Sequence, residues 1–188
     1  MEFVLASASE RRKELLTRLC KEFKVVESFF PEDKVKFNDN LEEYVKKLSL
    51  GKAQYVANKL GIDNIVIAAD TIVAINDTIL GKPKDKQDAY NMLNSLSGNV
   101  HKVYTGVTVM NLKTKKTVSE AVCTKVKFSP LDEDTIISYI ESGEPLDKAG
   151  AYGIQGYGGI FVESIEGCYY NVVGLPLNKL DKILRLIV

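Results

Sequence analysis

One carboxylate in the middle of an apolar run constrains this chain most. Residues 65–75 read IVIAADTIVAI, in which Asp70 and Thr71 are the only polar side chains. The run is rich in Ile and Val and too short to span a membrane, so it predicts a β-strand buried on both faces. Because an unpaired buried carboxylate is costly, Asp70 needs a partner. It is either a structural aspartate paired with a core lysine, or a metal ligand or general base at a strand end.

A basic, hydroxyl-rich segment follows the first predicted strand at residues 3–5. Ser7 or Ser9 suits the N-cap of a helix that contains Arg11 and Arg12. Free N–H groups, two hydroxyls and two guanidinium groups together form a potential anion site. The alternative is an ordinary capped surface helix with solvated arginines. The apolar side of this helix would contain Leu15, Leu16 and Leu19.

Lys52 lies on the apolar stripe of a second predicted helix. Asp39 and Glu42 have the spacing of a capping-box variant at its start. A lysine on an inward face either extends its ammonium group to solvent or meets an anion. The stripe that contains Lys52 consists of Leu41, Tyr44, Val45, Leu48, Tyr55 and Val56.

Residues 147–159 contain five of the thirteen glycines of the chain. This density is typical of a loop that needs positive φ or a close approach of its backbone to a ligand, although a long flexible loop is the alternative. The segment has neither the dinucleotide-binding nor the P-loop pattern. Gln155 in this loop offers both a donor and an acceptor to a base edge.

Two other loop segments supply charges. Lys82 lies in Gly81–Lys82–Pro83, just after the hairpin that contains Asp70, although this motif also suits a plain surface turn. Glu32 and Asp33 follow a short strand predicted at residues 23–26. Together with Asp70, such a loop acid provides oxygen ligands for Mg²⁺ or Mn²⁺.

Bulk properties exclude several classes of protein. Lys plus Arg and Asp plus Glu each number 25, so no basic field favours binding to nucleic acid. The three cysteines lack C-x-x-C spacing, which favours reduced thiols, and His101 is the only histidine, which argues against zinc or Ser-His-Asp chemistry. The absence of a signal peptide or a long apolar span predicts a cytoplasmic protein without membrane association.

The remaining patterns predict an α/β protein in one domain over residues 1–188. A helix begins after Asp85 and stops at Gly98, and another begins at Ser129–Pro130 and ends at Gly143. The other predicted elements are strands at 101–112 and 117–128, a hairpin of strands 159–165 and 168–173, and a last helix over 177–186.

Seven ordered motifs resemble the Maf family of nucleoside triphosphate pyrophosphatases. The similarity extends from residue 3 to residues 173–176, and Glu10, where many members carry Pro, is the one departure. The motifs are Ser7-x-Ser9-x-x-Arg12-x-x-Leu15-Leu16, the loop Glu32, Lys52-Ala53, Ala69-Asp70-Thr71-Ile72-Val73, Gly81-Lys82-Pro83, Leu96-Ser97-Gly98, and the segment from Glu144 to Gly156.

This resemblance implies a mixed twisted sheet with flanking helices, two lobes around a central cleft, and a homodimer. It also implies hydrolysis of a nucleoside triphosphate to the monophosphate and pyrophosphate with a divalent metal ion. Thr71 and the Gly-Ile-Gln-Gly sequence are similar to the subgroup that favours dTTP and UTP. His101 has only a structural place in this family.

The residues and the resemblance converge on one mechanism. Ser7, Ser9, Arg11 and Arg12 would bind the triphosphate together with Lys52 and Lys82. Asp70, with Glu32, would bind the metal or activate water for attack on the α-phosphorus. Thr71 and Gln155 would select the base, because hydrogen bonds discriminate more strongly than apolar fit.

Two other functions stay open at this point. The first is a pyrophosphatase that acts on 7-methyl-GTP or on a noncanonical purine such as ITP, against which the glycine loop argues. The second is a nucleotide-binding regulator of septum formation without turnover, against which the intact Asp70, Lys52 and Lys82 argue. For the enzyme, nucleotide-pool cleansing and control of cell division are both expected roles.

Overall fold

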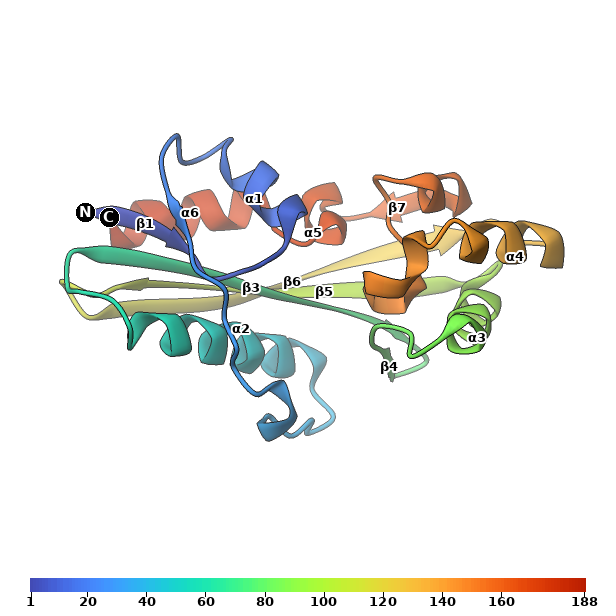
Figure 1. The fold of residues 1–188 in the computed structure, drawn as a ribbon, viewed down its shortest axis with the longest axis horizontal. Helices are drawn as coiled ribbons and strands as arrows, with labels where there is room; N and C mark the ends of the chain where they lie inside the picture. The colour runs from blue at the N-terminus through green and yellow to red at the C-terminus, as the bar shows by residue number, and fades with distance from the viewer. The chain divides into compact units, whose positions relative to one another are not determined.

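The computed structural model describes residues 1–188 as a mixed α/β protein with a seven-stranded sheet (Figure 1). The main path of the sheet has the order β2-β1-β3-β5-β6-β7, and β4 pairs with β3. The mixed α/β class is therefore confirmed. The strands are β1 (Glu2–Leu5), β2 (Lys24–Val25), β3 (Asn64–Ile75), β4 (Thr78–Leu80), β5 (Val100–Asn111), β6 (Lys116–Phe128) and β7 (Val162–Glu166). The helices are α1 (Glu10–Leu16), α2 (Leu41–Ala57), α3 (Lys86–Leu96), α4 (Glu133–Glu141), α5 (Tyr169–Val173) and α6 (Leu177–Ile187), and the 3₁₀ turns are η1 (Glu32–Lys34), η2 (Glu144–Asp147), η3 (Ala149–Ala151) and η4 (Tyr157–Phe161).

The chain forms two compact units. Unit 1 contains residues 1–70, 105–122 and 174–188, and unit 2 contains residues 71–104 and 123–173. Asp70 is thus the last residue of one unit and Thr71 the first of the other. None of the helices combines the length and the apolar character needed to cross a bilayer.

In unit 1 the first strand pairs in parallel on both sides, with β2 and with the first half of β3. Helix α2 covers one face of these strands, and α1 and α6 cover the other (Figure 1). Small and branched side chains form the core against α2, because they allow the helix to approach the sheet closely. This core consists of Val4, Ala6, Ala53, Val56, Val66 and Ala68.

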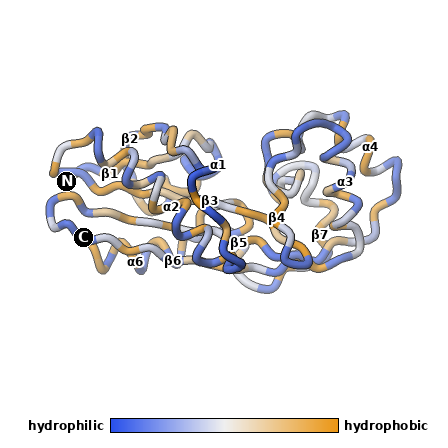
Figure 2. Tube along the Cα trace, turned by 90° about the horizontal axis from the view of Figure 1, so that it is seen from below, coloured by the Kyte–Doolittle hydropathy of each residue, from blue (hydrophilic) through white to orange (hydrophobic).

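The last helix shows how the sequence specifies this packing. Hydrophobic and hydrophilic residues alternate along α6 with helical spacing, as the colours of Figure 2 show. Its buried residues are Leu177, Leu180, Ile183 and Ile187. The predicted helix at 177–186 is therefore confirmed, with its apolar stripe inward.

Unit 2 is built around an aromatic cluster. Phe128 makes edge-on contacts with His101, Tyr152 and Phe161, and Tyr139 packs against Phe161. His101 is 1% exposed, and its Nε2 lies 2.8 Å from the Tyr152 hydroxyl. Burial lowers the pKa of His101 to about 4, so this histidine is neutral at pH 7.

The predicted start of α2 is wrong by one residue. Asn40, and not Asp39, caps the helix, and its side chain accepts a hydrogen bond from the Glu43 amide. Asp39 adopts a positive φ of 59°. Asn and Asp tolerate that conformation and also make good caps, so the spacing alone does not distinguish them.

The predicted start of α4 is also wrong. Ser129 and Pro130 precede the helix, and Asp132 caps it by accepting a hydrogen bond from the Thr135 amide at 2.8 Å. The Ser129 amide instead donates to the carbonyl of Phe161, the last residue of η4. This bond keeps Ser129 outside the helix. The helix ends at Glu141, and Gly143, predicted to stop it, follows two residues later with a φ of 77°.

Residues 168–173 do not form the second strand of a hairpin. Residues 162–166 form β7, but the following segment is the short helix α5. The Thr124 hydroxyl accepts from the Cys168 amide, and the Asn171 amide group donates to the Val103 carbonyl and to Thr124. These hydrogen bonds hold Cys168 and Asn171 against Thr124 and Val103, so tertiary contacts override the strand propensity of Tyr and Val.

Candidate active site

A lysine lies between two carboxylates in unit 1. Lys52 Nζ donates to Asp70 Oδ1 and lies 2.8 Å from Glu32 Oε1. The side chains of Lys52 and Asp70 are 13% and 9% exposed, whereas Glu32 is 55% exposed. The pair that the structural hypothesis predicts for Asp70 is thus present. The second carboxylate, however, makes both acids converge on one cation position.

Regular structure brings these three side chains together. Asp70 lies in the buried strand β3, which confirms the strand prediction. Lys52 follows Tyr44 and Leu48 at four-residue intervals, so all three lie on one face of α2. Glu32 begins the turn η1. The inward position expected for Lys52 is confirmed, and its ammonium group meets anions.

The cluster carries one excess negative charge, because two carboxylates face one ammonium group. Burial raises the pKa of Tyr44, and the charges of Asp70 and Glu32 raise it further. From its spacing, Tyr44 was predicted only as part of an apolar stripe. Tyr44 precedes Lys52 by eight residues, which places both on the same face of a helix. That spacing was the available signal that Tyr44 lies near Asp70 and Glu32.

The predicted anion-binding segment lies in the same unit, and its groups contact one another. The Ser9 side chain caps α1 by accepting from the Arg12 amide. Arg12 Nε donates to the Gly174 carbonyl at 2.9 Å, and its Nη1 lies 3.4 Å from the Ser7 hydroxyl. Arg12 is therefore held from two sides, while Arg11 is half-buried on the same helix.

The electrostatics of Arg12 connect this segment to the carboxylates. Burial lowers the pKa of Arg12, the charge of Asp70 raises it, the charge of Arg11 lowers it, and Glu32 raises it. An arginine nevertheless stays protonated in a protein. Unit 1 therefore presents cationic and anionic groups in one field, as a metal-dependent phosphate site requires.

The other predicted site residues belong to unit 2. Thr71 is half-buried in β3, and Lys82 and Gln155 are exposed. The Gly150 amide donates to the Gly81 carbonyl at 3.0 Å, which joins the segment before Lys82 to the glycine loop. Within unit 2 the structure thus brings two of the predicted motifs together.

The glycine loop is compact. It contains the turns η3 and η4, and Gly150, with a φ of 69°, packs against Val73 of β3. Glu144 and Tyr139 hold the loop through its backbone amides. Neither residue was predicted to have a role, because nothing in the spacing of Tyr139 and Glu144 indicates a bond to a backbone amide.

The two acids of unit 1 fit a divalent metal ion. The structure contains no group of three or more His, Cys, Asp or Glu side chains arranged for a metal. Mg²⁺ needs fewer, because it binds through one or two carboxylates and takes its other ligands from water and substrate phosphates. The convergence of Glu32 and Asp70 on one ammonium group meets this requirement.

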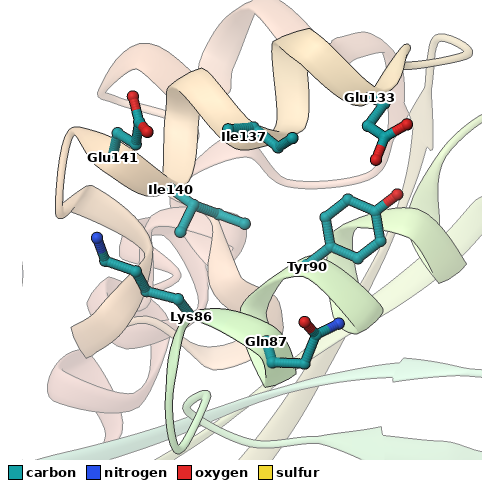
Figure 3. A pocket seen from close by; sticks show the side chains of 7 residues that line it. All are labelled: Lys86, Gln87, Tyr90, Glu133, Ile137, Ile140 and Glu141. Carbon is teal, nitrogen blue, oxygen red and sulfur yellow. The ribbon is translucent and has the colours of Figure 1, made fainter.

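A separate hollow lies between α3 and α4 (Figure 3). Its volume is about 400 Å³, and Ile137 and Ile140 form its apolar part beside Tyr90. Lys86, Gln87, Glu133 and Glu141 complete the lining. None of the predicted site residues lines it.

Comparisons with known proteins agree with this description. Two solved structures share the fold: a HAM1 protein from Coxiella burnetii (TM-score 0.54, 14% identity, 99% of both chains) and the Ham1 protein of Staphylococcus aureus (TM-score 0.51, 12% identity, 98% of both chains). At these identities the likeness concerns the fold alone.

Sequence relatives are much more similar. A protein of Clostridium beijerinckii named dTTP/UTP pyrophosphatase is 57% identical over 185 residues, which cover 98% of each chain. One of Clostridium tetani with the same name is 58% identical over 186 residues, which cover 98% of this chain and 97% of the relative.

The fold is mixed α/β and similar to that of the two HAM1 proteins, and unit 1 contains a cluster of opposite charges. The Maf-like protein family matches residues 2–187. The chain belongs to this family, which confirms the resemblance drawn from the seven motifs.

Proposed function

We propose that this protein is a nucleoside triphosphate pyrophosphatase that hydrolyses dTTP and UTP to the monophosphate and pyrophosphate. The observation that carries the proposal is the convergence of Glu32 and Asp70 on Lys52, beside Arg12. The relatives named dTTP/UTP pyrophosphatase support the substrate.

In this proposal, water attacks the α-phosphorus, and the bond from that phosphorus to the bridging oxygen breaks. Pyrophosphate leaves with that oxygen. Asp70 would either accept the proton of the attacking water or hold the metal together with Glu32, in which case the proton would pass to solvent. A bound Mg²⁺ or Mn²⁺ would offset the charge on the leaving group.

The cationic side chains hold the triphosphate. Arg12 is fixed by its bonds to Gly174 and Ser7, so its guanidinium plane is preorganised for phosphate oxygens. Arg11, Lys82 and the hydroxyls of Ser7 and Ser9 add further contacts. Lys52, which contacts Asp70 and Glu32 in this structure, would supply a further positive charge to the phosphates.

Thr71 and Gln155 select the base. A uracil or thymine edge offers the O4 acceptor and the N3–H donor, and one amide side chain can pair with both. Cytosine and the purines present other patterns. We further propose that the protein acts in the cytoplasm as a homodimer, which size-exclusion chromatography with light scattering tests.

The deciding experiment measures pyrophosphate release from UTP, dTTP, CTP, ITP, dATP, dGTP and 7-methyl-GTP with Mg²⁺ or Mn²⁺. Chromatography identifies the nucleotide product. We expect UMP and dTMP with one pyrophosphate each. A product UDP with phosphate contradicts the reaction, a preference for 7-methyl-GTP or ITP contradicts the substrate, and nucleotide binding without turnover favours the regulator.

A further inference from the structure

The glycine loop wraps around one carboxylate. Glu144 begins η2, and its Oε1 accepts from the Tyr139 hydroxyl at 2.9 Å. The Tyr157 amide donates to Glu144 Oε2 at 2.9 Å, and the Gly158 amide lies 3.4 Å from Oε1. One side chain therefore connects α4 to the backbone of the loop.

Two of the loop glycines lie where Glu144 and Tyr139 leave no space for a side chain. A Cβ added to Gly156 would collide with the Glu144 carboxylate, and one added to Gly158 would lie 2.7 Å from the Tyr139 hydroxyl. Neither glycine has a positive φ. Close approach to Glu144 and Tyr139 thus explains them, whereas the sequence suggested positive φ or a ligand.

These bonds fix the backbone on both sides of Gln155. The Gly153 amide, two residues before it, donates to the Tyr139 hydroxyl at 3.2 Å. The Tyr157 amide, two residues after it, donates to Glu144. The Gly156 amide donates to the Gly153 carbonyl at 3.3 Å and closes a turn between them. The exposed Gln155 side chain therefore projects from a turn with two anchors.

A third residue, Lys148, holds the backbone of Glu144 in place. Lys148 Nζ donates to the Glu144 carbonyl and to Asp147 Oδ1, both at 2.6 Å, and its side chain is only 15% exposed. Burial and the hydrogen bond to Glu144 raise the pKa of Tyr139. Its hydroxyl therefore stays protonated and donates to Glu144 throughout the neutral range.

We propose that Glu144 and Tyr139 are positioning residues that hold Gln155 in the orientation in which it reads the base. This inference rests on the proposed function. A preorganised amide discriminates between base edges, because the loop pays little ordering entropy when the nucleotide binds. If the anchor is lost, the loop has to order around the base, and the binding of the preferred nucleotide weakens.

Three variants distinguish the hydrogen bonds of Glu144 and Tyr139 from the negative charge of Glu144. Glu144→Ala removes every acceptor, Tyr139→Phe removes the hydroxyl that joins Glu144 to Gly153, and Glu144→Gln keeps one oxygen acceptor and the shape. Glu163→Ala is the control in the same unit, because Glu163 is a half-exposed partner of Lys127 outside the loop. Exposed ion pairs of this kind contribute little to stability.

We expect Glu144→Ala to raise KM for UTP about tenfold while kcat changes less than about threefold, because a binding contact is lost in ground and transition states alike. The ratio of kcat/KM for UTP to that for dATP falls by a similar factor. Tyr139→Phe has a smaller effect of the same kind, Glu144→Gln the smallest, and the control none.

Amide hydrogen exchange at residues 155–158 provides a readout that does not depend on turnover. It increases in Glu144→Ala and not in Glu163→Ala. Faster exchange with unchanged KM and unchanged base preference overturns the inference, and so does an equal loss of kcat on all nucleotides with a lower melting temperature. Wild-type turnover of UTP tests the proposed function, and only the difference between wild type and variants tests this inference.

Discussion

The carboxylate cluster of unit 1 and the glycine loop of unit 2 are both held in position by hydrogen-bonded side chains, but in different ways. In the cluster, side chains of α2, β3 and η1 hold one another, and Lys52 pairs with Glu32 and Asp70. In the loop, side chains hold the backbone, and Glu144 accepts from the amides of residues 157 and 158. The cluster is suited to hold charged side chains in position, and the loop is suited to hold a fixed backbone conformation.

The difference predicts how each region responds to substitution. A charge removed from the cluster upsets the charge balance of a partly buried site, in which Lys52 faces Glu32 and Asp70, so the effects on turnover are large. Removal of Glu144 from the loop leaves neutral backbone amides, and not a charge, without an acceptor, so the effects are smaller and concern selectivity. The following predictions test this contrast.

Asp70→Asn has the largest expected effect. The change is nearly isosteric and removes the charge that holds Lys52 and would hold the metal, so we expect kcat to fall about 10³-fold or more. Pyrophosphate release measures turnover, and circular dichroism verifies the fold. Activity near that of wild type would contradict the assignment of the cluster.

Lys52→Met and Lys82→Met should each lower kcat/KM for UTP about 10²-fold, because each lysine neutralises phosphate charge. Only Lys52→Met should also tighten Mn²⁺ binding to the nucleotide-free protein, by roughly tenfold, because its ammonium group competes for the same carboxylates. Electron paramagnetic resonance of Mn²⁺ measures this affinity.

Lys46→Met is the matched control on the same helix, since Lys46 pairs with the exposed Glu43. It should leave both quantities unchanged. If Lys52→Met folds normally and binds Mn²⁺ no more tightly than wild type, the two carboxylates are not the metal ligands. An unchanged rate in both Lys52→Met and Lys82→Met would make them structural or surface lysines.

Acid should destabilise the loop region through His101. Its pKa is lowered from 6.5 to about 4 by burial, so the folded state favours the neutral ring. Its contribution to stability is complete above pH 6.5 and is lost as the pH falls toward 4. Urea unfolding should show about 2 kcal/mol less stability at pH 5 than at pH 7 from this group.

His101→Gln is the comparison for this effect, because it keeps a polar partner for Tyr152 and cannot titrate. The wild-type loss between pH 7 and pH 5 should exceed that of the variant. Parallel pH profiles of the two proteins would show that His101 does not carry the dependence.

Gln155→Glu has the smallest expected effect. It replaces an amide donor by an acceptor, so kcat/KM for UTP should fall about tenfold while the melting temperature hardly changes. Hydrolysis rates on UTP, dTTP and dATP measure the selectivity. An equal loss on all three nucleotides would place Gln155 on the phosphates or in the loop scaffold.

Sequence patterns predicted the cluster better than the loop for a physical reason. Helical and strand periodicity located Lys52 on an inward face and Asp70 in a buried strand, because both lie in regular elements. The same patterns failed where one local signal had two solutions, as at Asp39 and Asn40. They also failed at residues 168–173, where bonds to Thr124 and Val103 decide the structure.

The role of Glu144 was beyond sequence patterns altogether. Its partners are backbone amides thirteen and fourteen residues away. Because almost every residue has a backbone amide, the residue types in the sequence do not indicate which amides a side chain will bind. The glycine density marked the loop correctly. Only the structure shows that Gly156 makes space for the carboxylate of Glu144.

The side chain of Asn111 at the end of β5 brings both ends of the chain together. It donates to the Ile187 carbonyl at 2.9 Å and lies 3.8 Å from the sulfur of Met1, and Figure 1 shows the termini side by side. The first and the last residues described here therefore lie close together within unit 1. A short linker would join the two ends, new ends could be opened in a surface turn, and a circular permutant would keep the same neighbours in space.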